Sequence, residues 1–230
     1  MGMERFTAKW YDRFARKRLE QFKTLAKMVA ENVAEGDSIL EVAPGPGYLA
    51  IELAKLGKYT IVGLDISSTF VEIAQKNATE AGVGVAVEFR QGDAAHMPFD
   101  DETFDFIIST AAFMPLDDAT FGFIFSKAAF KHFADPIGVL HEMHRVLRAH
   151  GKAVIIDMRS DASDETIRDT VKSMGWSRIG SIMQNRNYKS FRRTAYTKNQ
   201  LEDYISKTKF RRYDIRDPEN SMEREIWLEK

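Results

Sequence analysis

The chain carries one piece of itself twice, end to end. Residues 97–113 read MPFDDETFDFIISTAAF, residues 114–130 read MPLDDATFGFIFSKAAF, and the two segments agree at twelve positions without a gap. Two copies of so short a unit cannot build a solenoid, because repeat folds need three or more stacked units to bury a core. The repeat is therefore expected to be a duplication inside one domain, and its meaning depends on the elements around it.

The composition is that of one globular domain. The 230 residues are 44% hydrophobic, enough for one large core, and the net charge of −1 gives no general argument for nucleic acid or membranes. No apolar run approaches the roughly 18 residues that span a bilayer, and the N-terminal segment lacks an apolar signal core. Without cysteine there is no disulfide, thiolate nucleophile or cysteine-bound zinc. We expect a cytoplasmic protein without a metal site; a homodimer is compatible with the sequence.

Strand patterns alternate with helix patterns along most of the chain. Apolar runs predict strands at 38–43, 59–65, 85–93, 104–110, 152–159, 210–217 and 224–230. Helical spacing separates most of these strands. The predicted helix caps are Thr69 with Glu72, Asp135 with Pro136, and Thr197 with Gln200, and Gly151 is expected to end the helix that starts at Pro136. Such alternation predicts a parallel sheet covered on both faces, with the strand-to-helix loops, and hence the ligand site, at one edge.

Glycines and acids stand in the first three of these loops. Glu41 ends the first strand, and Gly45 and Gly47 follow it, where glycine lets the backbone approach a ligand and the next helix offers free N–H donors. Asp65 ends the second strand, where a carboxylate can accept both hydroxyls of a ribose. Asp93 ends the third strand, near the expected position of an adenine amino group.

Two cofactors fit this arrangement. The segment GPGYLA matches the dinucleotide pattern with alanine last, and Asp65 lies twenty residues after Gly45, as expected for NAD. Glu41, however, lies just four residues before Gly45, where its charge opposes a pyrophosphate and suits the ammonium group of a methionine moiety. Asp93 adds a contact that adenosine can use. The balance favours S-adenosylmethionine, with an NAD-binding oxidoreductase as the alternative.

Five ordered segments resemble the motifs of class I S-adenosylmethionine-dependent methyltransferases: ILEVAPGPGYLA, IVGLDIS, VEFRQGDAAHMPF, FDFIIS and HEMHRVLRAHGKAVIID. The nearest group is the ubiquinone-biosynthesis-like, type 11 small-molecule methyltransferases, and the likeness covers residues 36–160. The resemblance implies a Rossmann-like α/β fold with helices on both faces of a seven-stranded, mostly parallel sheet, ordered 3-2-1-4-5-7-6 with strand 7 antiparallel. It also implies S-adenosylmethionine as methyl donor and S-adenosylhomocysteine as product.

Several residues match cofactor-contacting positions of that family: Glu41, Ala43, Gly45 and Gly47 in the methionine-side loop, Asp65 and Ile66 at the ribose and adenine, Asp93 and Ala94 at the adenine amino group, and Ser109 and Thr110 after strand 4. One position departs from the pattern, because Ala43 stands where the family has its first glycine. Tyr11 resembles an N-terminal tyrosine that closes over the cofactor in some relatives, and a packing role in the core is the competing interpretation.

The reaction implied by the resemblance is in-line methyl transfer in a closed pocket. Alignment of acceptor, methyl and sulfur can supply about 7–11 kcal/mol, and a base is needed only when the acceptor must lose a proton. His132 is the best-placed candidate base, against the alternative of a structural histidine, so no base is assigned. A small-molecule acceptor leads. An RNA or other anionic acceptor comes second, and a non-catalytic cofactor-binding or interaction module third.

The second alternative rests on one basic segment, residues 170–201, which contains seven Lys and Arg residues, no acid, and four interleaved aromatic residues. Such a segment can bind nucleic acid or an anionic substrate. It can equally be the solvated face of helices packed on the core. We expect one domain over residues 1–230, in which residues 1–35 form a helical cap and residues 161–207 form a helical, basic insertion before the last two strands.

Within that domain the duplicated segment is strand 4 with its flanking turns, and the sheet has room for one copy. The first copy begins its strand with Asp105 and ends it with Thr110. The second has Gly122 inside the strand and would place the charge of Lys127 beside the cofactor, and both are unfavourable. The sequence therefore predicts that the first copy occupies the sheet.

Overall fold

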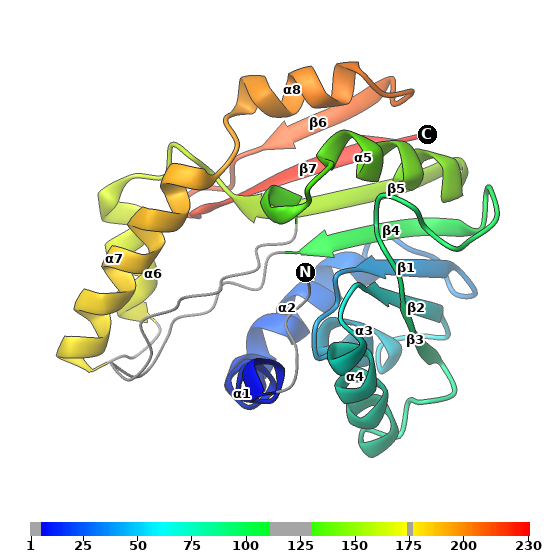
Figure 1. Ribbon diagram of the computed structural model, residues 1–230, viewed down its shortest axis with the longest axis horizontal. Helices are drawn as coiled ribbons and strands as arrows, with labels where there is room; N and C mark the ends of the chain where they lie inside the picture. The colour runs from blue at the N-terminus through cyan, green and yellow to red at the C-terminus, as the bar shows by residue number, and fades with distance from the viewer. Residues whose placement is uncertain (1–5, 111–129, 174–176) are drawn as a thin grey trace.

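A seven-stranded sheet lies at the centre of the protein, in a computed structural model that describes residues 6–110, 130–173 and 177–230 (Figure 1). The strand order is β3-β2-β1-β4-β5-β7-β6. Neighbours from β3 to β5 are parallel, and β7 is antiparallel to both β5 and β6. The strands are β1 (Ser38–Val42), β2 (Thr60–Asp65), β3 (Val87–Gln91), β4 (Phe104–Thr110), β5 (Leu147–Met158), β6 (Arg212–Arg216) and β7 (Glu223–Glu229). The order and directions implied by the resemblance are confirmed.

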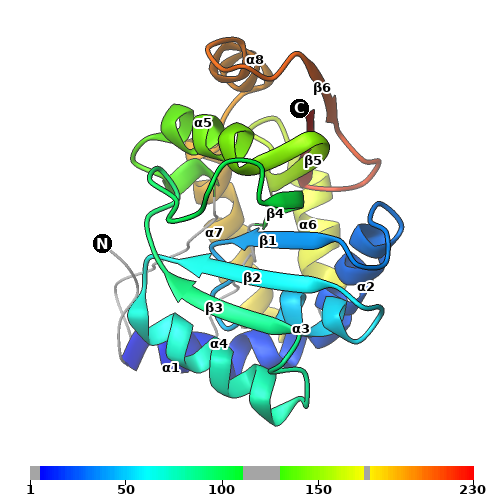
Figure 2. The ribbon, with the colours of Figure 1, turned by 90° about the vertical axis from the view of Figure 1, so that its right-hand side faces the viewer.

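Helices cover both faces of the sheet (Figure 2). They are α1 (Phe6–Ala15), α2 (Leu19–Ala30), α3 (Tyr48–Ala54), α4 (Ser68–Glu80), α5 (Pro136–Val146), α6 (Asp164–Ser173), α7 (Arg178–Thr194) and α8 (Lys198–Ser206), with 3-10 turns at Arg16–Arg18 and Phe130–His132. Alternate strand residues point to opposite faces. Ile39 packs in one core with α2, α3 and α4, and Leu40 packs in the other with α5 and α8. None of the helices in the described part of the chain is long and apolar enough to cross a membrane.

A third, smaller core lies at one end of the sheet, where α6 and α7 run side by side (Figure 1). Its centre is the fully buried Tyr188 of α7, which packs with Ile167 and Val171 of α6 and with Met158 and Met222 from the ends of β5 and β7. Because these strands extend beyond their neighbours toward α6 and α7, this cluster closes the edge of the sheet that holds the strand-to-helix loops.

The first copy of the duplicated segment forms β4, between β1 and β5, as predicted. The carboxylate of Asp105 explains its advantage: it accepts hydrogen bonds from the backbone N–H of Ser38 at 2.9 Å and from the Arg148 guanidinium at 2.6 Å. The second copy has Gly122 at the corresponding position and cannot make these contacts. Apart from Phe130, that copy lies outside the described residues.

Two local predictions were wrong. The cap of α4 is Ser67, whose hydroxyl accepts from the Phe70 N–H, and not Thr69 with Glu72. The other error concerns Gly151, which does not end α5. Strand β5 begins directly at Leu147, the fully buried partner of Phe104 across the sheet. The predicted caps Asp135 and Thr197 are confirmed, the latter with a complete capping box.

Candidate active site

The loop between β1 and α3 turns through left-handed backbone at three positions. The φ angles are 59° at Ala43, 55° at Gly45 and 79° at Gly47, which is the N-cap residue of α3. The Gly47 N–H donates to the Pro44 carbonyl at 3.1 Å, which closes the turn. Ala43 donates to the Leu64 carbonyl at 2.8 Å and Gly45 donates to the Asp65 carboxylate at 3.0 Å, so the N–H groups of the loop are used within the protein and fix its shape at the strand edge.

Ala43 is the one alanine in this loop with a left-handed backbone, where the family has glycine. A side chain in that region costs about 1–2 kcal/mol, which glycine would remove. Glycine also has a larger entropy in the unfolded state, and this offsets part of the stabilisation. We expect Ala43→Gly to raise the free energy of unfolding by about 0.5–1 kcal/mol in urea denaturation. A loss of stability would show that the Ala43 methyl group makes contacts that outweigh the strain.

Asp65 ties the loop to the next strand. The side chain is 6% exposed, one carboxylate oxygen accepts from the Gly45 N–H at 3.0 Å, and the other accepts from the Ser67 N–H at 2.9 Å. These contacts hold the carboxylate of Asp65 at the strand edge beside the loop, where the predicted contact with a ribose would lie.

Glu41 is buried behind the same loop. Its carboxylate accepts from the Ala50 N–H in the first turn of α3 at 3.0 Å. Burial raises the pKa of Glu41 to about 8; the Ala50 N–H opposes this rise, and the nearby Asp65 adds to it. At neutral pH the carboxyl group of Glu41 is therefore mostly uncharged, and a neighbouring cation would favour its ionised form. The position consequently suits an ammonium group better than a phosphate.

Tyr11 of α1 covers the loop from the N-terminal side. Its ring packs edge-on against Phe70 at 5.3 Å between centroids, and a side-chain carbon added to Gly45 would lie 3.7 Å from the Tyr11 ring. Burial raises the pKa of the Tyr11 phenol, and the nearby Asp65 and Glu41 contribute. Tyr11 therefore packs in the core and also borders the loop, so both interpretations of this residue fit the structure.

The predicted adenine contacts lie at the ends of β2 and β3. Ile66 is an exposed apolar side chain, and its carbonyl accepts from the Gln91 amide at 3.3 Å. Asp93 is exposed and accepts from the Ala95 N–H at 2.9 Å, whereas Ala94 is buried in the core on the α5 side. Ile66 and Asp93 thus offer an apolar surface and a carboxylate at adjacent strand ends.

The structure separates the two predicted residues of β4. Ser109 pairs with Val42 and Ile155 and points into the α5-side core, where its buried hydroxyl has no hydrogen-bond partner among the described residues. Thr110 points to the opposite face, beside Ile156. That face also carries Glu41, whose register partner on β4 is Ile108. Thr110 is the residue of the pair that reaches the site.

A cavity of about 590 Å³ begins at Thr110. It extends across Ile156 of β5 and is bordered by α2, α6 and the segment that precedes β7. Phe22, Leu25 and Met222 give it apolar walls. Since Val42 pairs with Ser109, the loop after β1 leaves the sheet next to the end of β4, where the cavity begins.

The sequence analysis missed the charged residues of this cavity, Arg18, Glu223 and Glu225. The segment EREIWLE did carry a signal, because Glu223 and Glu225 alternate with Arg224 and Ile226 and must therefore point to one face of the strand. No comparable pattern marked Arg18. His132 is exposed and is not among the described residues that line the cavity. No group of metal-binding side chains occurs within residues 6–110, 130–173 and 177–230.

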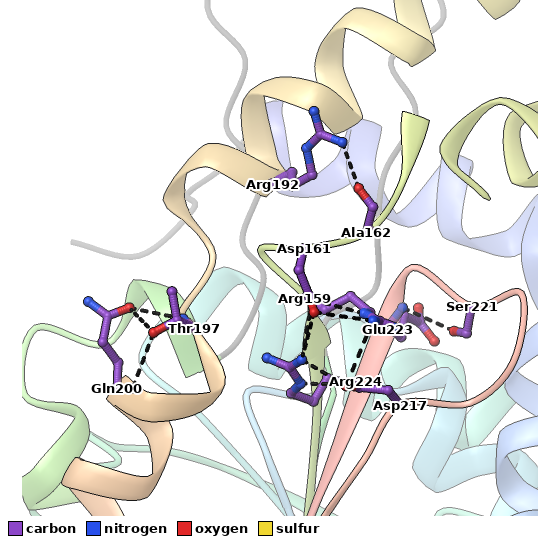
Figure 3. A network of polar contacts seen from close by, with 10 residues as sticks. All are labelled: Arg159, Asp161, Ala162, Arg192, Thr197, Gln200, Asp217, Ser221, Glu223 and Arg224. Carbon is purple, nitrogen blue, oxygen red and sulfur yellow. Dashed lines mark hydrogen bonds and ion pairs between the residues drawn. The ribbon is translucent and has the colours of Figure 1, made fainter. Parts of the chain in front are cut away.

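An ion-pair network fixes the strand ends beside the cavity (Figure 3). The guanidinium of Arg224, a buried residue of β7, pairs with Asp217 at 2.6 Å and with Asp161 at 3.2 Å, and Arg159 pairs with Asp161 at 3.0 Å. The Glu223 N–H donates to the Ser221 hydroxyl at 3.0 Å. These contacts hold the first residues of β7 in place against the end of β5.

The comparisons with known proteins agree with this architecture. A 28% identical relative, the demethylmenaquinone methyltransferase of Lactobacillus johnsonii, aligns over 66% of this chain and 54% of its own length. The ubiquinone/menaquinone biosynthesis C-methyltransferase UbiE of Geotalea uraniireducens is 31% identical over 54% of this chain and 46% of its own length. The chain thus spans about half the length of these curated relatives.

A solved structure shares the fold over its full length. The protein, from Methanococcus maripaludis and assigned to the S-adenosyl-L-methionine-dependent methyltransferases, superposes with a TM-score of 0.74 and 21% identity, covering 100% of this chain and 96% of its own. The model of the family described as "Methyltransferase domain" matches residues 34–195. The chain belongs to this methyltransferase domain family, which confirms its resemblance to the class I S-adenosylmethionine-dependent methyltransferases.

Proposed function

We propose that the protein transfers the methyl group of S-adenosylmethionine to a small-molecule acceptor bound in the cavity beside Thr110. The observation that carries the proposal is the placement of the site along one strand edge: Glu41 of β1 and Asp65 at the end of β2 lie beside the β1–α3 loop, and the 590 Å³ cavity begins at Thr110, next to the Ser109 that pairs with Val42 at the end of β1. A methyl donor in the loop would then present its reactive carbon to the cavity. Membership of the methyltransferase domain family supports the same conclusion.

The residues of the loop suit this cofactor. The two oxygens of Asp65 can accept from ribose hydroxyls, the buried carboxyl group of Glu41 can face the amino-acid ammonium, and Ile66 can lie against the adenine ring. When bound, S-adenosylmethionine supplies an activated methyl group on a sulfonium. The protein contributes alignment and exclusion of water, which α1 supports by covering the loop with Tyr11.

The cavity suits an acceptor with an apolar body and a polar end. Its volume lies in the range of small-molecule sites, and Phe22, Leu25 and Ile156 face a set of polar groups at the start of β7. The relatives are named for demethylmenaquinone and for ubiquinone and menaquinone biosynthesis. We therefore propose a hydroxylated aromatic ring, such as a reduced quinone, as the acceptor class.

The basic segment gives less support to an RNA acceptor. Lys189 and Arg192 pair with Asp164 at 2.6 and 2.9 Å, and Tyr188 is fully buried. Tyr196 packs edge-on against Tyr204. Aromatic side chains that stack on bases must face solvent. We therefore propose an enzyme that acts on a small molecule. We also propose a cytoplasmic location and a single domain in which residues 1–35 form a cap.

Transfer of label tests the proposal. The protein is incubated with S-adenosylmethionine labelled with tritium in the methyl group and with 1,4-naphthalenediol, a reduced naphthoquinone, under anaerobic conditions. We expect labelled methylnaphthalenediol or its methyl ether. If the protein binds S-adenosylmethionine but transfers no label to this diol or to phenol, amine and thiol probes, the proposed activity is wrong.

Binding of the cofactor is expected to release a proton from Glu41. Burial raises the pKa of this carboxyl group to about 8 in the free protein, so the group is mostly protonated at pH 7, and a neighbouring ammonium lowers that pKa. Calorimetry at pH 7 in buffers of different ionisation enthalpy should show release of close to one proton with S-adenosylmethionine. Adenosine, which lacks the ammonium, should release none, and release that persists in Glu41→Gln would contradict the assignment.

A further inference from the structure

One carboxyl group in the cavity makes neither a hydrogen bond nor an ion pair with the described part of the chain. Glu223 begins β7, is partly exposed and lines the cavity, and its backbone N–H, rather than its side chain, makes the contact with Ser221. Its neighbour in the same wall, Glu225, accepts from the Trp227 indole N–H at 2.9 Å. The carboxylate of Glu223 is thus the one available to an occupant of the cavity.

The position of this group relative to the methyl site follows from the strand register. Thr110 pairs with Ile156, Ile156 pairs with Glu225, and Met158, two residues further along β5, pairs with Glu223. All of these residues point to the same face of the sheet. An acceptor that fills the cavity therefore spans from the cofactor side at Thr110 to the carboxylate of Glu223.

Charged groups on several neighbouring elements affect the pKa of Glu223. Burial raises the pKa of Glu223 to about 7; Arg18, in the 3-10 turn before α2, opposes this rise, and Asp157 of β5 and Glu225 of β7 add to it. Tyr188 of α7 also faces the group, and burial raises the pKa of its phenol to about 12, so that it stays protonated. Glu223 can therefore exchange a proton near neutral pH.

We propose that Glu223 is the general base of methyl transfer, accepting a hydrogen bond from an O–H or N–H of the acceptor and taking that proton. This inference rests on the proposed function. As the acceptor's bond to hydrogen breaks, the proton passes to Glu223, and the freed electron pair forms the bond to the methyl carbon. The carbon–sulfur bond breaks with its electrons staying on sulfur, which leaves neutral S-adenosylhomocysteine, and Glu223 later gives the proton to water. Glu223 takes the role for which His132 was a candidate.

Probe binding tests the recognition step without a known acceptor. Calorimetry in the presence of S-adenosylhomocysteine compares 2-naphthol, which donates a hydrogen bond, with 2-methoxynaphthalene, which does not. At about pH 8.5 we expect 2-naphthol to bind about 10-fold more tightly, because a hydrogen bond to a charged acceptor contributes about 1.5–3 kcal/mol. The preference should shrink as the pH falls through about 7, the range in which Glu223 becomes protonated.

The matched variants are Glu223→Gln and Glu229→Gln, the latter on the same strand but paired with Arg212 outside the cavity. Glu223→Gln should lose the preference for 2-naphthol at every pH. It should also lower the rate of label transfer by about 100-fold, and the remaining rate should no longer fall as the pH drops through about 7. Glu229→Gln should behave as wild type in both measurements. A preference that survives in Glu223→Gln overturns the role of Glu223 while leaving methyl transfer intact. If S-adenosylhomocysteine binds but neither naphthalene does, the cavity is not the acceptor site. Failure of S-adenosylhomocysteine itself to bind overturns the proposed function instead.

Discussion

Gly47→Ala is expected to lower the free energy of unfolding by about 1.5–4 kcal/mol, combining a net backbone penalty of about 0.5–1 kcal/mol with overpacking of about 1–3 kcal/mol. The φ angle at Gly47 is 79°, and an added methyl carbon would lie 2.5 Å from the Phe89 ring and 2.9 Å from the Ala74 side chain. Since Gly47 is the N-cap residue of α3, the loop must shift with it. Urea denaturation measures the loss.

Gly82→Ala separates the two causes. Gly82 also has a left-handed backbone, with φ of 75°, but no atom lies within 4 Å of the position of an added methyl carbon. This variant should lose about 0.5–1 kcal/mol, which is the left-handed strain of about 1–2 kcal/mol less the lower unfolded-state entropy of alanine. Equal losses in the two variants would mean that the close contact of the β1–α3 loop with Phe89 does not restrict residue 47.

Asp65→Ala is expected to weaken the binding of S-adenosylhomocysteine by at least about 100-fold, because each lost hydrogen bond to a charged acceptor costs about 1.5–3 kcal/mol. The substitution also removes the acceptor of the Gly45 and Ser67 N–H groups, so the melting temperature of the free protein should fall. Calorimetry and a thermal melt without ligand measure the two effects separately.

Asp93→Ala is the comparison for Asp65→Ala. Its carboxylate is 55% exposed, and its contacts in the protein are with the nearby Ala95 N–H and with the exposed His96 ring at 3.8 Å, so water screens it more strongly. We expect its effect on the affinity for S-adenosylhomocysteine to be about 10-fold or less. Undiminished affinity in Asp65→Ala would remove this residue from the cofactor site, whatever the result for Asp93→Ala.

The sequence was sufficient for the sheet and for the loops at its edge. Each strand has apolar residues of β-forming type, and caps such as Asp135 and Thr197 depend on local hydrogen bonds, so neighbouring residues determine them. The choice between the two copies was also predictable, since a glycine inside a strand and a buried lysine are unfavourable by themselves. The anchoring of Asp105 by Ser38 and Arg148 became visible with the structure.

The wrong or missing predictions have two causes: several residues could serve equally well as a cap or boundary, and some contacts join segments that are distant in the sequence. The sequence Ser67-Ser68-Thr69 offers three hydroxyl caps, and the packing of Phe70 selects the first. The helical pattern of α5 continues past Leu147, but pairing with Phe104 makes that residue part of a strand. The cavity joins Arg18 to Glu223, which are near opposite ends of the chain, and no local pattern relates them.

The most direct measurement is a calorimetric titration of the protein with S-adenosylmethionine, S-adenosylhomocysteine and NAD in parallel. The arrangement of Glu41 behind the loop and Asp65 beside it predicts binding of both adenosyl ligands with Kd in the micromolar range, and no binding of NAD. Binding of NAD alone, or of none of the three, would contradict the assignment of this loop to S-adenosylmethionine.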